Sequence, residues 1–154
     1  MSSRHRILAV VLIAALLLVS GAGLAVAKAK SVSTACHDAT YWRTHPESWP
    51  VDSVNVGYNS SNTPIRYTKA QAIEILRMPV DNDMTYVVFR EDLAAKLNSI
   101  AVTNPPYLPV GQCLSADMWL QQYPLGSKVS RSSDVWSDIS GVVANLSTFN
   151  HWRP

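Results

Sequence analysis

The sequence predicts a mainly α fold: a small single domain of four to five helices around a central helix at about residues 84–101. Over that range apolar residues recur three or four positions apart on two nearly opposite sides, which predicts a helix buried on both flanks. The strand-like pattern is short and lies between residues 54 and 67, so we expect one hairpin-like extended segment. Two cysteines in the chain predict one disulfide bond.

A targeting segment precedes the predicted domain. Arg4 and Arg6 come before an unbroken apolar run at residues 7–19, and Ala25-Val26-Ala27 has the small residues of a signal-peptidase site. We therefore expect cleavage after Ala27. An uncleaved anchor is the alternative, because the apolar run extended through Ala27 just reaches the about 20 residues that a membrane span needs.

The domain organisation follows from this segment: a signal peptide at 1–27, a small polar linker at 28–35 and one extracytoplasmic domain at 36–154. The whole chain has 13 basic and 11 acidic residues, and both basic residues of the signal peptide leave on cleavage, so the remaining net charge is about zero. The sequence contains no basic run. We therefore expect no nucleic-acid partner, and contact with a membrane only through the signal segment if it stays uncleaved.

The two cysteines are Cys36 and Cys113, and in an exported chain they predict a disulfide. The bond would close a long loop and stabilise the fold by about 4 kcal/mol. The alternative is a pair of thiols that bind a metal or stay free.

The hairpin is expected from Val54–Tyr58 and Ile65–Tyr67, joined by the turn-forming residues at 59–64. A helix should begin directly afterwards, because Thr68 and Gln71 have the spacing of a capping box.

The central helix should be capped by Asp81 or Asp83. Its two apolar stripes predict burial on both sides, with four charged residues emerging at the margins: Arg90, Glu91, Asp92 and Lys96.

Two further helices are expected toward the end of the chain. Ser115 is the predicted cap of a short helix that contains Met118 and Trp119. A final helical region should begin at residues 132–134, and Ser140-Gly141 could divide it into a short turn and a longer helix.

The segment C-H-D-A-T-Y-W-R-T-H-P-E-S-W-P at residues 36–50 concentrates the aromatic and imidazole groups. Its prolines predict a rigid loop or entry segment. The binding candidates of the chain are Trp42, His45, Trp49 and Trp152. One interpretation is an aromatic platform that stacks on sugars or on a partner's side chains. The other is that the tryptophans fill the core of a domain with only two phenylalanines.

Metal-binding and catalytic patterns are weak. His37, His45 and His151 are the candidate metal ligands, but no H-E-x-x-H or paired C-x-x-C spacing supports them, and hydrogen bonding of His45 to backbone is the alternative. The sequence also has no G-x-S-x-G and no phosphate-binding glycine loop. We therefore expect no cofactor and no catalytic residue.

The order of motifs resembles a domain found in many secreted or cell-surface proteins of bacteria and archaea. The resemblance covers nearly all of residues 41–149, with Y-W-R-T-H-P-E-S-W-P, Y-T-K-A-x-A-I-x-I-L, A-A-K-L-N, one cysteine and S-S-D-V-W in that order. Members commonly show a G-Y-W-K-N-H-P-E-A-W-P type motif, from which this chain departs at Ala39-Thr40 and Arg43-Thr44. The resemblance implies an extracytoplasmic location and a compact domain, without an established activity.

These observations predict a secreted or surface-displayed structural or binding module without catalytic activity, whose partner is an extracellular protein or polysaccharide. The alternative function is a metal-dependent or simple hydrolase with a histidine site. Convergence of the three candidate imidazoles to within about 4–5 Å would favour the hydrolase.

Overall fold

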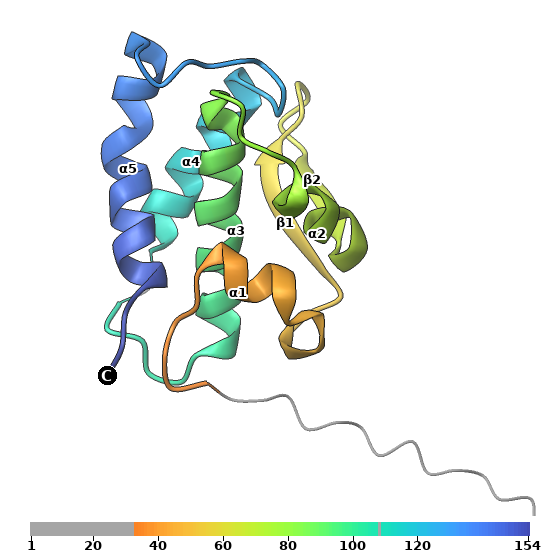
Figure 1. Ribbon diagram of the computed structural model, residues 1–154, viewed down its shortest axis with the longest axis vertical. Helices are drawn as coiled ribbons and strands as arrows, with labels where there is room; N and C mark the ends of the chain where they lie inside the picture. Colours follow the sequence, from red (N-terminus) through yellow and green to blue (C-terminus); the bar gives the residue numbers. More distant parts are fainter. Residues whose placement is uncertain (1–32, 108) are drawn as a thin grey trace, which may run out of the picture.

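The computed structural model describes residues 33–107 and 109–154 (Figure 1). The predicted signal peptide and most of the predicted linker lie outside the described residues. The elements of the described part are α1 (Ala39–Thr44), the 3₁₀ turn η1 (Pro46–Ser48), β1 (Ser53–Tyr58), β2 (Pro64–Thr68), α2 (Lys69–Arg77), α3 (Met84–Ala101), α4 (Val110–Gln122) and α5 (Asp134–Asn150). None of the described helices is long and apolar enough to cross a membrane.

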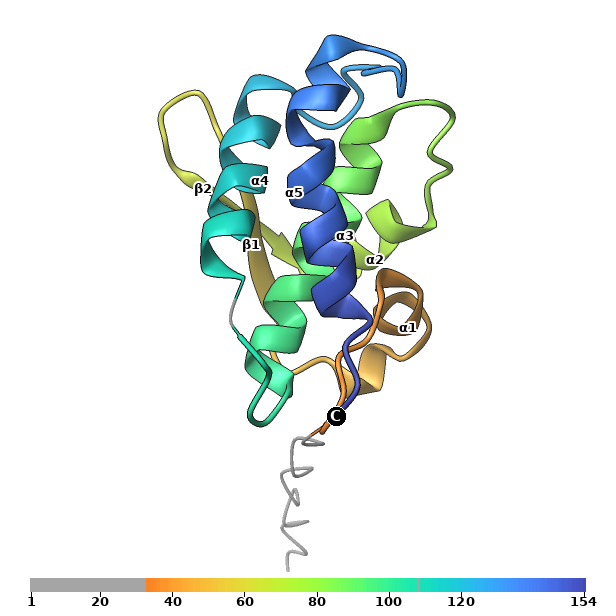
Figure 2. The same cartoon turned by 90° about the vertical axis from the view of Figure 1, so that its left-hand side faces the viewer.

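Helix α3 is the centre of the fold and has the range that the sequence predicts. It packs against α1, α2, α4, α5 and β1 (Figures 1 and 2). Buried side chains occur all around it, from Met84 in the first turn to Asn98 in the last. Asp83 is its N-cap, and the side chain accepts a hydrogen bond from the Thr85 amide.

The hairpin of β1 and β2 is antiparallel, with Ser53 opposite Thr68 and Asn55 opposite Arg66, and an irregularity follows Asn55. It lies beside α3 and α4 and buries Val54 and Val56 (Figure 1). The predicted capping box is present at the start of α2: Thr68 accepts from the Gln71 amide, and the Gln71 side chain accepts from the Thr68 amide.

Helices α4 and α5 differ in detail from the sequence-based expectation. Helix α4 begins at Val110, so Ser115 lies inside it and donates to the carbonyl of Gly111 instead of capping the helix. Helix α5 is continuous through Gly141, which is exposed and has nothing within 4 Å of its would-be Cβ. Packing of the apolar face of α5 against α3 and α4 therefore outweighs the low helix propensity of glycine.

The segments at the two ends of the domain are neighbours. The amide of Cys36 donates to the carbonyl of Trp152 at 3.1 Å, and Figure 2 shows both segments below α3. The Asn98 side chain, fully buried in α3, holds the backbone of His37 through both its oxygen and its nitrogen, at 2.9 and 2.8 Å. Asn98 also donates to the buried Asn150 at 2.9 Å.

The predicted Cys36–Cys113 disulfide is wrong: both cysteines are free and buried. Cys36 lies beside the C-terminal segment, where Asn98 anchors the next residue of the chain. Cys113 lies beside Asp92, six positions earlier on α3 than Asn98. Six residues of helix correspond to about 9 Å along the axis and a turn of about 120° between the two positions. The two thiols therefore lie against different faces of the central helix.

Candidate functional site

The two tryptophans of the aromatic segment are part of the core. The exposed fraction is 1% for Trp42 and 7% for Trp49. The indole nitrogen of Trp49 donates to the carbonyl of Trp42 at 2.7 Å, which fixes η1 against α1. Burial of both rings favours the core interpretation over an aromatic platform.

The remaining binding candidates lie nearer the surface. His45 is exposed and Trp152 is half-buried against the core. The Tyr41 ring stacks on His37 with centroids 3.6 Å apart, and on His45 with centroids 4.3 Å apart. Two imidazoles at these distances cannot both stack on the same face of the Tyr41 ring, so the tyrosine lies between His37 and His45.

The three histidines considered as metal ligands are not brought together. Tyr41 separates His37 from His45, and His151 bonds through Nδ1 to the carbonyl of Ser147 and approaches Asp38 at 3.9 Å. In the described ranges, no group of three His, Cys, Asp or Glu side chains is placed to hold a metal ion. The sequence-predicted residues therefore do not form one site.

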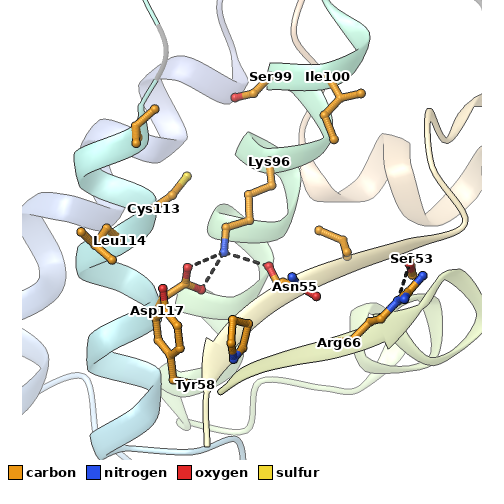
Figure 3. Close-up of a pocket in the computed structure, with 13 residues that line it drawn as sticks. Ser53, Asn55, Tyr58, Arg66, Lys96, Ser99, Ile100, Cys113, Leu114 and Asp117 are labelled. Atoms are coloured by element: carbon orange, nitrogen blue, oxygen red, sulfur yellow. Dashed lines mark hydrogen bonds and ion pairs between the residues drawn. The ribbon is translucent and has the colours of Figure 1, made fainter. Parts of the chain in front are cut away.

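A different region has the geometry of a site. A hollow of about 710 Å³ opens between the hairpin, α4 and the C-terminal half of α3 (Figure 3). Exposed aliphatic side chains line one part of it: Ile100 from α3, and Val110 and Leu114 from α4. Polar groups line the remainder, including Arg66 of β2, Lys96 of α3 and Asp117 of α4.

Lys96 is the centre of the polar part (Figure 3). Its Nζ lies 2.6 and 2.7 Å from the two carboxylate oxygens of Asp117 and donates to the carbonyl of Asn55 at 2.9 Å. Asp117 in turn accepts a hydrogen bond from the amide of Gly57. These contacts join α3 and α4 to the edge of β1 that does not pair with β2. Lys96 and Asp117 thereby provide hydrogen-bond partners for the carbonyl and the amide of that edge.

Asp92 lies one turn before Lys96 and is fully buried, contrary to its predicted position at a margin of the helix. Lys96 Nζ forms an ion pair with Asp92 Oδ2 at 2.8 Å, in addition to its hydrogen bonds to Asp117 and Asn55. Among the described residues, no donor reaches either oxygen of Asp92 with the geometry of a hydrogen bond. Burial raises the pKa of Asp92 to about 7; the Lys96 charge opposes this rise and the Asp117 charge adds to it.

Cys113 completes the cluster on the side of α4. Burial, together with the neighbouring charge of Asp92, raises the pKa of the Cys113 thiol far above its usual range. Burial also raises the pKa of Cys36 to about 11, although Arg153 opposes that rise. Neither thiol is therefore an activated nucleophile at neutral pH.

Sequence reasoning missed this site because its members are far apart in the chain. The one local signal is the spacing of Asp92 and Lys96, which places an acid and a base one helical turn apart. That spacing is also typical of a solvated helix face. Comparison of the chain with protein-family models, with curated proteins and with solved structures finds no match.

Proposed function

We propose that this protein is an exported binding module without catalytic activity, and that the hollow between the hairpin and α4 binds its ligand. The observation that carries the proposal is the grouping of Ile100, Val110 and Leu114, whose exposed fractions are 53%, 68% and 48%, around one hollow. Exposed aliphatic side chains that gather around a concave surface are typical of ligand-binding sites. Export is supported by the signal-like segment at residues 1–27.

The chemistry of the hollow favours a peptide segment of an extracellular protein as the ligand. The aliphatic part suits apolar side chains. Arg66 stands on the strand that borders it, uses Nε to hold Ser53 at 2.8 Å, and forms no ion pair with the described residues. Its remaining guanidinium donors suit a carboxylate. A polysaccharide has less support, because Trp42 and Trp49 are buried and present no stacking surface.

A histidine-dependent hydrolase is the weaker candidate. It needs several imidazoles around one cleft, whereas Tyr41 lies between His37 and His45. Of the described residues that line the hollow, none is a histidine.

The test uses an aromatic sulfonate dye, anilinonaphthalene sulfonate, as an apolar anion whose fluorescence rises on binding. We expect the folded protein to bind the dye, and expect Leu114→Glu and Arg66→Glu each to weaken binding at least about tenfold. Met78→Glu is the matched control, because Met78 is similarly exposed but lies at the end of α2, outside the hollow. Absence of dye binding, or equal weakening by the control, would contradict the proposal.

A further inference from the structure

We propose that Lys96 and Asp117 become joined by an amide bond that the protein forms by itself, so that α3 and α4 are covalently linked. The proposal concerns the polar part of the hollow and does not depend on which ligand the aliphatic part binds. It goes beyond the binding function because it assigns a chemical modification to the chain.

The two reacting groups are in contact. Lys96 Nζ lies within 2.7 Å of both oxygens of Asp117, so the nitrogen is in contact with the carboxyl group. Rotation of that group about its Cβ–Cγ bond would turn the face of its carbon toward the nitrogen. The side chains are held there from two helices, and their exposed fractions are only 19% and 13%. Such fixed proximity replaces a bimolecular encounter and removes its entropic part from the barrier.

Asp92 supplies the proton transfers. With Asp92, Lys96 and Asp117 all ionised, the cluster carries one excess negative charge in a largely buried setting. Uptake of one proton makes it neutral, and the raised pKa of Asp92 places this uptake near neutral pH. In the neutral cluster a proton can pass from the ammonium of Lys96 to Asp117, which leaves an amine opposite a protonated carboxyl group without a change in net charge. Against the effect of burial, the charges of Asp92 and Asp117 raise the pKa of Lys96, so this reactive form is the minor one and the reaction is slow.

The reaction then balances without any further reactant. The Lys96 amine attacks the carbonyl carbon of Asp117 and forms the C–N bond. The Gly57 amide, which already donates to Asp117 Oδ1, stabilises the negative charge that develops on that oxygen. Asp92, which is protonated in the neutral cluster, gives its proton to the departing hydroxyl group, and its Oδ2 accepts one from the nitrogen, so that Asp92 is protonated again when the amide has formed. The C–O bond breaks, and water leaves through the open hollow (Figure 3).

The product suits its surroundings better than the reactants do. An ion pair buried between helices keeps a large desolvation penalty. The amide replaces both charges by a neutral group, and the Gly57 donor and the Asn55 acceptor remain available to it. The lower desolvation penalty of the neutral amide thus favours the link. The alternative state is an ordinary salt bridge between Lys96 and Asp117.

Intact-mass measurement separates the two states. The full chain is expressed, its N-terminus is determined, and the mass of the folded protein is compared with that of the corresponding polypeptide. We expect a mass lower by one water molecule. A mass equal to that of the unmodified polypeptide would overturn the proposal.

Peptide mapping locates the link. No Lys or Arg lies between Lys96 and Lys128, so tryptic digestion should give one fragment from Glu91 to Lys128 in which Lys96 is not cleaved. Chymotrypsin should then cut between Lys96 and Asp117 and yield a branched peptide. A cyclic imide at an aspartate also loses water but leaves Lys96 a trypsin site, and that outcome would overturn the proposal.

Two variants test the roles. Lys96→Arg keeps the charge but removes the amine, and Asp92→Asn keeps the shape but removes the proton acceptor, so both should have the full mass. Lys69→Arg, on α2, is the matched control and should retain the loss of water. A water loss that persists in Lys96→Arg would overturn the link, and one that persists in Asp92→Asn would overturn the role of Asp92. If a variant does not fold, the branched peptide of the unmodified sequence decides the question.

Discussion

The two buried aspartates of the α3 region have opposite environments. Asp83 has an exposed fraction of 6% and accepts hydrogen bonds from the Thr85 amide and hydroxyl, at 3.0 and 2.8 Å, and from the amides of Lys128 and Val129, at 3.0 and 3.3 Å. Burial alone would raise the pKa of Asp83, but these hydrogen bonds outweigh it and hold the pKa below its usual value. Asp92 is more deeply buried, has no such donors, and its pKa is raised.

The difference separates a structural carboxylate from a reactive one. Asp83 caps α3 and ties the loop before α5 to it, so its charge contributes to folding. Asp92 keeps proton affinity near neutral pH beside a lysine and a second carboxylate, which is the arrangement that proton transfer requires. Burial is common to both residues, and the number of hydrogen-bond donors decides the role of each.

The largest effect is expected for Asp83→Ala. The substitution removes the N-cap of α3 and leaves buried amides of Lys128 and Val129 without an acceptor. We expect the free energy of unfolding to fall by about 3 kcal/mol or more. Urea unfolding followed by circular dichroism measures it, with Asp138→Ala, on the exposed side of α5, as the control. A decrease of less than about 1 kcal/mol in the free energy of unfolding would show that the hydrogen bonds of Asp83 contribute little to folding.

The pH dependence should carry the signature of Asp92. The folded state binds the Asp92 proton up to about pH 7, whereas the unfolded state releases it near the ordinary aspartate pKa of 3.8. The folded state therefore holds more protons between these values, and this group makes stability fall as pH rises through that window. We expect the stability of Asp92→Asn to lack this decrease. Urea midpoints below, within and above the window test this.

Asp83 should give the opposite dependence at lower pH. The pKa of Asp83 is lower in the folded state than its ordinary value of 3.8, so its contribution to stability is present above that value and is lost as pH falls below it. A wild-type stability that stays flat between pH 4 and 7 would contradict the raised pKa of Asp92.

Gly57→Ala tests the backbone conformation that places the Gly57 amide against Asp117. Gly57 has φ +73°, and an added Cβ would lie 3.3 Å from the Cβ of Leu120. We expect a loss of about 1–2 kcal/mol, because a left-handed conformation and a close contact both disfavour a side chain. Gly141→Ala is the matched control in α5, has open space around it, and should gain about 0.5–1 kcal/mol. Thermal unfolding of both variants compares them, and equal effects would count against the constraint at Gly57.

The smallest effect is expected for the exposed ion pair of α2. Arg77 and Glu74 are 2.6 Å apart, but their side chains are 60% and 65% exposed. We expect Glu74→Ala to change the free energy of unfolding by less than about 0.5 kcal/mol. The same urea assay applies, and a loss comparable to that of Asp83→Ala would show that ion-pair distance matters more than burial.

Local patterns predicted much of the fold. Helical spacing gives the bounds of α3, although the sequence does not decide between Asp81 and Asp83 as its cap, and the Thr68–Gln71 box gives the start of α2. The prediction of Ser115 as a cap is wrong. The sequence does not distinguish a serine that caps a helix from one inside a helix whose hydroxyl donates to a carbonyl of the preceding turn.

The disulfide and the site could not be predicted in the same way. Pairing of Cys36 with Cys113 depends on which face of α3 each cysteine meets, and spacing in the sequence does not contain that information. The contact of Lys96 with Asp117 likewise depends on how α4 packs against α3. Trp42 and Trp49 are binding candidates because of their large aromatic rings, but the same rings provide much of the apolar surface that the core buries.

The hydrogen bond between Cys36 and Trp152 has a practical consequence for engineering. A domain whose ends meet can be inserted into a surface loop of a carrier protein without forcing the carrier's flanking residues apart. The same proximity allows a circular permutant, in which a short linker joins the two ends of the domain and new ends open in the hairpin turn between the exposed residues Ser60 and Ser61.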